Sequence, residues 1–294
     1  MKIAIYGQSP DKISKNIFLE LLNISKNEGI ILFIEEKYNT ILLKKSKISH
    51  NHKLFSSHND LDSSIDLMIT IGGDGTLLRS ITFVRDLGIP IIGINTGRLG
   101  FLATLNQEIL NVELKKILKA EFDVEERSLL EVSIGNNQNF SDFNFALNEV
   151  SVGRKNTTSM IEIKTILDGE YLNTYWADGL IASTPTGSTG YSLSCGGPIM
   201  TPSSQTFSIT PIAPHNLNAR PLVISDEIKI ELSVKGREKS HLLSLDSQII
   251  SLKNNVKIFI KKANYKVKLA SISNNSFYKT LRNKLLWGED RRNL

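Results

Sequence analysis

Three glycines surround an acidic residue in the segment Gly72-Gly73-Asp74-Gly75-Thr76. The segment directly follows an apolar run over residues 67–71 that is typical of a buried strand, and it precedes a stretch that we expect to be helical. Glycines let the backbone turn sharply and approach a ligand closely, and the free N–H groups at a helix N-terminus favour an anion. The pattern therefore predicts a phosphate-binding loop formed by Gly72, Gly73 and Gly75.

The loop matches neither of two common nucleotide-binding patterns. The chain lacks Gly-x-x-x-x-Gly-Lys-Ser/Thr, and Gly73-Asp74-Gly75 is not followed by the third glycine of a dinucleotide fingerprint. A carboxylate inside a phosphate loop repels its ligand unless it has a task, such as accepting a proton from an attacking hydroxyl or holding a metal. We expect Asp74 to be the proton acceptor in a phosphoryl transfer to a hydroxyl group.

A second segment, residues 178–199, is dense in glycine and in small hydroxyl side chains around Tyr191. Such a composition makes a poor core, yet it suits a pocket in which hydroxyl and backbone donors meet a nucleotide while an aromatic ring stacks on it. The alternative is a flexible linker. The apolar lead-in over residues 180–182 and the fixed turn at Pro185 argue against a linker.

Short apolar runs alternate with amphipathic stretches in the first third of the chain. Residues 3–6, 30–34, 67–71 and 89–94 are typical of strands, and the helical spacing of residues 18–24 indicates a helix between them. This alternation predicts an α/β domain with a parallel sheet, Rossmann-like or phosphofructokinase-like, over residues 1–102.

Beyond that domain the sequence is richer in β-branched residues and turns. The runs that indicate strands are residues 130–134, 160–167, 223–234, 241–245 and 256–260. We therefore expect a β-rich domain over residues 103–268. The segment 269–294 is charged and compatible with a helix, and we expect it to pack back on the α/β domain. Its apolar residues at helical spacing are Phe277, Leu281, Leu285 and Leu286.

The composition of the 294-residue chain restricts the classes of partner. A net charge of +5 with no sustained cationic tract does not indicate a nucleic-acid partner, whereas it suits a small anionic substrate. Cys195 is the single cysteine, so no intramolecular disulfide forms. No run approaches the ~18 apolar residues of a membrane span, and the apolar run over residues 3–6 is too short to be that of a signal peptide. We expect a cytoplasmic protein with no membrane partner.

The glycine loop, Asn148-Glu149 and the 178–199 segment, in this order and spacing, resemble the NAD kinase family. Residues 95–102 and the segment from Pro211 to Leu222 agree with that resemblance, which covers the chain from Leu67 to Val223. It implies an enzyme that phosphorylates the 2′-hydroxyl of the adenosine ribose of NAD, using ATP and a divalent cation. Mg²⁺ would bind through the ATP phosphates, with no metal-ligating residues in the protein.

The resemblance also implies roles for individual residues. Asp74 resembles the proton acceptor of the family, with Gly75 beside it, and Arg79 corresponds to a basic residue near the phosphates. Asn148 and Glu149 correspond to the pair that binds the base and ribose of NAD. The remaining implied NAD-binding positions are Trp176, Asp178, Thr189, Gly190, Tyr191, Ser192, Leu193, Ser194, Ala213 and Gln248.

Three positions depart from the family pattern. Gly190 stands where alanine is common, and Ser159 and Trp176 stand where basic residues are common. The last two leave open whether NAD or NADH is the acceptor, and the donor is ATP or polyphosphate. Arg98 either contacts phosphate or packs between domains, and His215 is interpreted as structural.

Two other functions remain open at this point. Lipid kinases of the diacylglycerol or sphingosine type share the Gly-Gly-Asp-Gly motif, and a dinucleotide-binding regulator without catalysis is also compatible with it. Three histidines in one segment, His50, His52 and His58, are interpreted as a solvated loop because no cysteines support a metal site. Since relatives are commonly homo-oligomers, the resemblance implies a homodimer or homotetramer that binds NAD and ATP.

Overall fold

The computed structural model describes residues 1–8, 11–44, 52–97, 100–105, 110–135, 143–155, 159–216, 218–272 and 276–286. The chain forms two compact units, Met1–Glu126 with Val267–Leu294 and Arg127–Lys266. The sequence placed its boundaries at residues 102 and 268 instead. The difference arises because β6 (Asp123–Arg127) and β19 (Val267–Ser271) are hydrogen-bonded within the sheet of the first unit.

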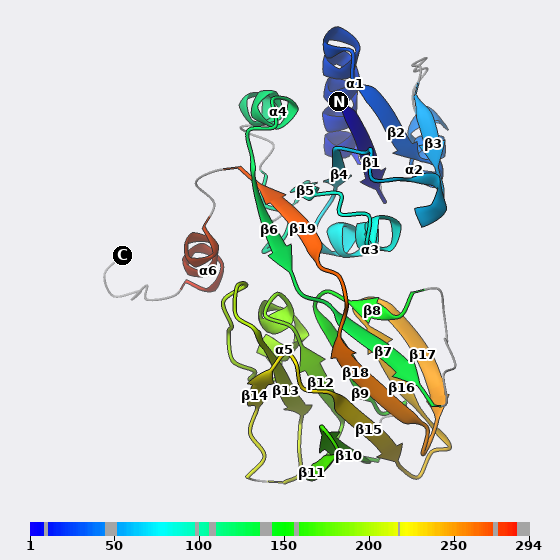
Figure 1. Cartoon of the computed structure of the whole chain (residues 1–294), viewed down its shortest axis with the longest axis vertical. Coiled ribbons are helices and arrows are strands. Elements are labelled where there is room, and N and C mark those ends of the chain that lie inside the picture. The colour runs from blue at the N-terminus through cyan, green and yellow to red at the C-terminus, as the bar shows by residue number, and fades with distance from the viewer. Residues whose placement is uncertain are drawn as a thin grey trace. The chain divides into compact units, whose positions relative to one another are not determined.

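The first unit is built on a seven-stranded sheet in the order β3-β2-β1-β4-β5-β19-β6 (Figure 1). The pairs from β3 through β19 are parallel, which confirms the predicted α/β fold. Its strands are β1 (Lys2–Gly7), β2 (Ile31–Glu35), β3 (Lys53–Phe55), β4 (Leu67–Ile71) and β5 (Ile91–Ile94), besides β6 and β19. Its helices are α1 (Lys12–Glu28), α2 (Glu36–Lys44), η1 (His58–Asp60), α3 (Asp74–Val84), α4 (Leu110–Leu118) and α6 (Phe277–Leu285).

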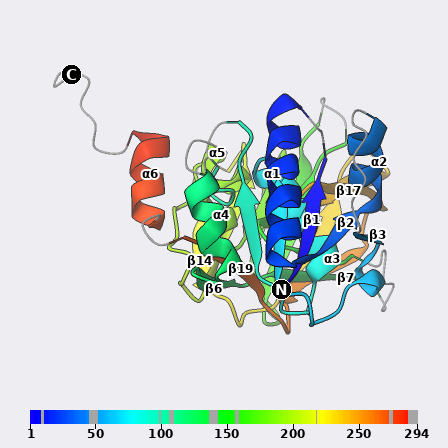
Figure 2. The same cartoon turned by 90° about the horizontal axis from the view of Figure 1, so that it is seen from above.

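An apolar cluster joins this sheet to its helices. Ile17, Phe18 and Leu21 of α1 pack against strand residues such as Ile5 and Ile69, and Figure 2 shows α1 lying along β1 and β2. The helix begins where the Asp11 carboxylate accepts the Ser14 N–H (2.6 Å) and ends at Gly29 in the left-handed conformation. The helical periodicity of residues 18–24 therefore predicted the right face of a longer helix.

The second unit consists of two six-stranded sheets in the orders β11-β10-β15-β18-β7-β8 and β14-β13-β12-β9-β16-β17. Their paired strands are antiparallel, which confirms the predicted β-rich part. The strands are β7 (Leu130–Ile134), β8 (Phe145–Ala146), β9 (Glu149–Gly153), β10 (Ile161–Leu167), β11 (Glu170–Ala177), β12 (Gly179–Ser183), β13 (Thr206–Ile212), β14 (Leu222–Ser225), β15 (Ile230–Lys235), β16 (Ser240–Leu245), β17 (Gln248–Lys253) and β18 (Lys257–Lys262). Two short helices, η3 (Gly187–Thr189) and α5 (Tyr191–Ser194), follow β12.

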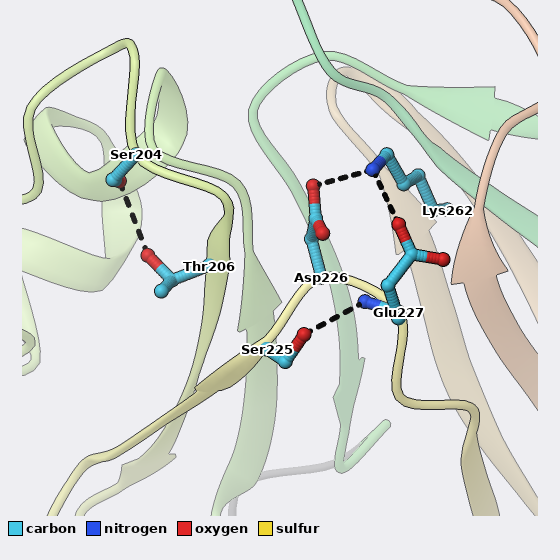
Figure 3. A network of polar contacts seen from close by, with 6 residues as sticks. All are labelled: Ser204, Thr206, Ser225, Asp226, Glu227 and Lys262. Carbon is cyan, nitrogen blue, oxygen red and sulfur yellow. Dashed lines mark hydrogen bonds and ion pairs between the residues drawn. The ribbon is translucent and has the colours of Figure 1, made fainter.

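A polar network fixes the turn between β14 and β15. The Lys262 ammonium lies 2.8 Å from carboxylate oxygens of both Asp226 and Glu227, and the Ser225 hydroxyl accepts the Glu227 N–H (Figure 3). Because Asp226 is buried, its charge needs this partner. The turn divides the run 223–234, which was expected to be one strand, into β14 of one sheet and β15 of the other.

The expected apolar face of α6 is only partly buried, since Phe277 and Leu281 are half-buried. Leu285 and Leu286 are 37% and 52% exposed, and Thr280 is the buried residue of this helix. The Lys284 ammonium lies over the ring of Phe101 at 5.7 Å from its centroid, within the first unit. In the part of the chain that the structure describes, no helix is long and apolar enough to cross a membrane.

Candidate functional site

The glycine loop joins a buried strand to a helix, as its sequence predicts. β4 ends at Ile71, Gly73 occupies the N-cap position without a capping side chain, and Asp74 is the first residue of α3. A side chain added at Gly73 or Gly75 would meet no atom within 4 Å, so the backbone there stands open to an approaching group. The uncapped N–H groups of the first turn make this end of α3 suitable for anionic oxygens.

The Asp74 carboxylate is held by the backbone of the segment that follows β5. Its Oδ2 accepts the Phe101 N–H (2.8 Å), and its Oδ1 accepts the N–H groups of Leu102 (3.1 Å) and Ala103 (2.9 Å). A carboxylate has about four acceptor positions, and three are occupied here. Asp74 is therefore fixed in orientation and keeps one lone pair, on Oδ2, for a further donor.

Gly100 allows this arrangement. A methyl group at Gly100 would overlap the Asp74 carboxylate, so only a glycine lets the chain pass this close. The sequence singled out residues 95–102 by resemblance alone, and their contact with Asp74 was not foreseen. Arg98, whose role was left open, lies outside the described residues.

Arg79 lies on the exposed side of α3, one turn beyond Asp74. With the Gln8 amide oriented so that its oxygen faces Arg79, that oxygen accepts Nε–H (3.0 Å) and Nη1–H (2.9 Å). Tyr6 adjoins this pair, and burial raises the pKa of its hydroxyl above the ordinary value. These three side chains come from the carboxyl end of β1 and from α3, the side of a parallel sheet at which ligands commonly bind.

Asn148 and Glu149 stand at the start of β9 in the second unit. Two of their side-chain atoms, Asn148 Oδ1 and Glu149 Oε2, are buried without a hydrogen-bond partner. Native proteins rarely leave such atoms unsatisfied, so these two acceptors are suited to donors from a ligand. Burial, followed by the neighbouring Asp246 carboxylate, raises the pKa of Glu149 to about 8, and the Tyr191 N–H opposes that shift.

The segment 178–199 is folded against this pair and is no linker. A side chain at Gly187 would overlap the backbone of Asn148, and the Thr184 N–H donates to the Asn148 carbonyl (2.9 Å). Residues 181–188 are buried throughout. The abundant hydroxyls were expected to line a pocket, yet those of Ser188 and Ser192 bond within the protein, to Pro185 and Thr210.

A cavity of about 400 Å³ brings several expected residues together. Glu149, Asp178 and Tyr191 line it, along with apolar side chains of Ile212, Leu242 and Ile249 and the polar residues Ser151, Gly153, Arg154, Ser244 and Asp246. The Arg154 guanidinium pairs with the Asp178 carboxylate at 2.9 Å. The cavity thus combines carboxylates suited to hydroxyl donors with apolar side chains suited to a ring.

Other expected residues lie outside this lining. Thr189 ends η3, Gly190 joins η3 to α5, and Leu193 and Ser194 lie in α5. Ala213 and Gln248 are exposed. Trp176 and Ser159 line a second cavity of about 560 Å³ together with Arg154, Lys235 and Arg237. This cavity therefore brings cations to the two positions at which the sequence lacks them, with Arg154 coming after β9, Lys235 from the end of β15 and Arg237 from beyond it.

Two of the histidines make hydrogen bonds within the protein, and His58 lies in η1, not in the solvated loop that the sequence suggested. His58 bonds the Phe83 carbonyl through Nδ1 (2.9 Å), and the His215 N–H donates to the Trp176 carbonyl (2.7 Å). His50 lies outside the described residues. Within the described ranges, no three His, Cys, Asp or Glu side chains gather into a metal-binding group.

Sequence reasoning missed Arg154 and Asp246. Both line the cavity, and Asp246 bonds the backbone on which Asn148 and Glu149 stand. The only local signal for Asp246 is an Asp-Ser pair between two apolar runs, which is typical of a hairpin turn.

Comparisons with known proteins agree over most of the chain. The model of the ATP-NAD kinase N-terminal domain matches residues 15–122, and that of the ATP-NAD kinase C-terminal domain matches residues 147–272. The NAD kinases of Flavobacterium psychrophilum and Flavobacterium johnsoniae are 53% and 51% identical over 294 residues, covering 100% of this chain and of each relative.

Two solved structures share the fold. Yeast NADH kinase complexed with NADH superposes with a TM-score of 0.86 at 22% identity, over 99% of this chain and 89% of the yeast chain. An NAD kinase from Archaeoglobus fulgidus in complex with ATP gives a TM-score of 0.76 at 27% identity, over 97% and 99% of the two chains.

Proposed function

From the premise that this chain belongs to the NAD kinase family and converts NAD to NADP with ATP, we propose roles for its individual residues. Asp74 accepts the proton of the adenosine 2′-hydroxyl, while Asn148 and Glu149 bind the base and ribose of NAD. Membership of the NAD kinase family excludes the lipid-kinase alternative. The conversion of NAD to NADP excludes a regulator without catalysis. The unsatisfied buried acceptors of Asn148 and Glu149 are the observation that carries the proposal.

The proposed reaction is a direct transfer. The ribose oxygen bonds to the γ-phosphorus as the bond from that phosphorus to the β,γ-bridging oxygen breaks, and ADP leaves. The ribose proton passes to the free lone pair of Asp74 Oδ2, whose orientation is fixed by three backbone N–H donors. Because phosphoryl transfer depends chiefly on positioning and electrostatics, this fixed orientation favours the reaction.

The cavity residues supply recognition. An ionised Glu149 can accept from two ribose hydroxyls at once, and Tyr191 offers a ring face for stacking. Gly72, Gly73, Gly75 and Arg79 serve the phosphates, and Asp178 contributes a carboxylate that lines the cavity. The other implied contacts remain proposals, namely Trp176, Thr189, Gly190, Ser192, Leu193, Ser194, Ala213 and Gln248.

A divalent cation, with Mg²⁺ preferred, is proposed to reach the enzyme on the ATP phosphates. Asp74 already spends three of its acceptor positions on backbone donors, which leaves it little capacity to hold an ion by itself. When bound, the ion screens the phosphate charge. A cytoplasmic location and a homodimer or homotetramer are proposed as well, to be checked by fractionation and by mass measurement in solution.

The test of these roles is a coupled assay of NADP formation from NAD and ATP with magnesium. Asp74→Asn should lower kcat by orders of magnitude with little change in the affinity for NAD, because the amide cannot take the proton. Glu149→Gln should instead raise the KM for NAD. Near-normal turnover of Asp74→Asn would remove Asp74 from the proposed mechanism.

A further inference from the structure

Asp246 makes four hydrogen bonds to Leu147, Asn148 and Glu149, the residues that lead into β9. Its Oδ2 accepts the Leu147 N–H (2.9 Å), and its Oδ1 accepts the N–H groups of Asn148 (2.9 Å) and Glu149 (3.0 Å). Its own N–H donates to the Glu149 carbonyl (3.0 Å). One side chain thus fixes the backbone from which both proposed ligand-binding side chains extend.

The hairpin that carries Asp246 explains this reach. β16 pairs with both β17 and β9, with Leu245 opposite Gln248 on one side and Val150 on the other. The turn therefore projects past the start of β9 and lies beside Asn148 and Glu149. Asp246 adopts a left-handed conformation (φ 48°), which aspartate tolerates better than most residues.

We propose that Asp246 is a positioning residue for NAD binding, which holds the Leu147–Glu149 backbone so that the Asn148 amide and the Glu149 carboxylate face the ligand. The inference rests on the role proposed for Glu149. Three charge-assisted hydrogen bonds to consecutive N–H groups leave this backbone little freedom. Buried Asn148 Oδ1 and Glu149 Oε2 therefore stay in place although no protein donor satisfies them.

Asp246 also adds negative charge beside Glu149, so it should affect how binding depends on pH. Burial raises the pKa of Asp246 to about 6, hence it is ionised when Glu149 titrates near 8. The other groups around Glu149 are Tyr191 and Cys195 of the α5 segment and the Asp178–Arg154 pair. Removing the Asp246 charge should let Glu149 ionise, and accept ribose hydroxyls, at lower pH.

The chain contains a matched control for Asp246. Asp168, in the β10–β11 hairpin, has the same left-handed backbone (φ 47°). Its Oδ1 accepts the Lys229 N–H (2.9 Å), and its own N–H donates to the Lys229 carbonyl (3.0 Å). Asp168 thus holds the residue before β15 through one backbone N–H, where Asp246 holds three, and it is not among the residues lining the cavity. Asp168→Asn therefore reports what this change does to a turn alone.

The experiment compares Asp246→Asn with Asp168→Asn in the full chain, measuring kcat and the KM for NAD between pH 6 and about 9, a range that spans the shifted carboxyl groups. We expect Asp246→Asn to raise this KM by about tenfold, since the amide turns a donor toward one backbone N–H. The pH profile of kcat/KM should move to lower pH by about one unit. Asp168→Asn should change neither. Equal behaviour of the two variants would overturn the proposal.

Two further variants keep the test decisive. Asp246→Glu retains the charge but is one methylene longer, so it should raise the KM while the pH profile stays in place. If Asp246→Asn unfolds below the assay temperature, an unchanged KM in Asp246→Glu overturns the proposal. Glu149→Gln separates the two proposals: a normal KM there refutes the role of Glu149, whereas a raised KM with an unaffected Asp246→Asn refutes the role of Asp246 alone.

Discussion

Gly100→Ala should inactivate the enzyme without removing any functional group. A methyl group at this position would approach Asp74 Oδ1 well inside the 3.0 Å that real Cβ atoms keep. Relieving the overlap requires the carboxylate to move by about 1 Å, a displacement that can cost about a hundredfold in rate when the group must meet a reacting atom. Turnover should therefore fall by about two orders of magnitude.

The same displacement should also be visible in stability. The bonds from Phe101, Leu102 and Ala103 to Asp74 are 2.8, 3.1 and 2.9 Å long, and a shift of this size weakens them. Each hydrogen bond to a charged group contributes about 1.5–3 kcal/mol. Partial loss of the set should lower the free energy of unfolding by about 2–4 kcal/mol, measured by urea denaturation.

Gly97→Ala is the matched control for this substitution. It lies in the same connection, and an added methyl group would meet nothing closer than the Asn95 Oδ1 at 3.9 Å. We expect its kcat to remain within about twofold of the original, as for an ordinary surface change. If Gly100→Ala also turned over normally, the Asp74 carboxylate would not need the position in which the segment 101–103 holds it.

The remaining predictions concern stability. Between pH 4.5 and 8 the folded chain without NAD keeps a proton on Glu149 that the unfolded chain releases. The free energy of unfolding should therefore fall as pH rises through this range. Glu149→Gln should flatten this dependence, measured by urea titrations at several pH values. Ser192→Ala removes a buried bond to Thr210 (3.0 Å) and should cost about 1 kcal/mol while the KM for NAD stays constant; a raised KM would place Ser192 at the ligand. Lys262→Met removes the cation that pairs with buried Asp226. It should lower the free energy of unfolding by about 2 kcal/mol and leave kcat unchanged. An unaltered melting temperature would contradict this.

Local sequence patterns predicted most individual elements. The apolar runs at residues 67–71 and 130–134 became β4 and β7 with the same bounds, because a buried strand needs consecutive or alternating apolar residues whatever surrounds it. The glycine loop was also predicted from the sequence, because glycines between a strand and a helix are typical of a sharp turn. The run 223–234 was misjudged, since the turn at Asp226 is stabilised by Lys262, which is distant in sequence.

The sequence placed Asp74 in a glycine loop between a strand and a helix and singled out Asn148-Glu149 by resemblance, because residue types and their spacing are local properties. The tertiary structure decided what holds them. Gly100 and the N–H groups of 101–103 meet Asp74, and Asp246 meets Asn148 from about a hundred residues away along the chain, through contacts that no periodicity records. The tertiary structure also decided that the hydroxyls of Ser188 and Ser192 bond within the protein, to Pro185 and Thr210. The sequence does not distinguish a hydroxyl that binds a ligand from one that bonds a neighbouring segment, because either group can be its partner.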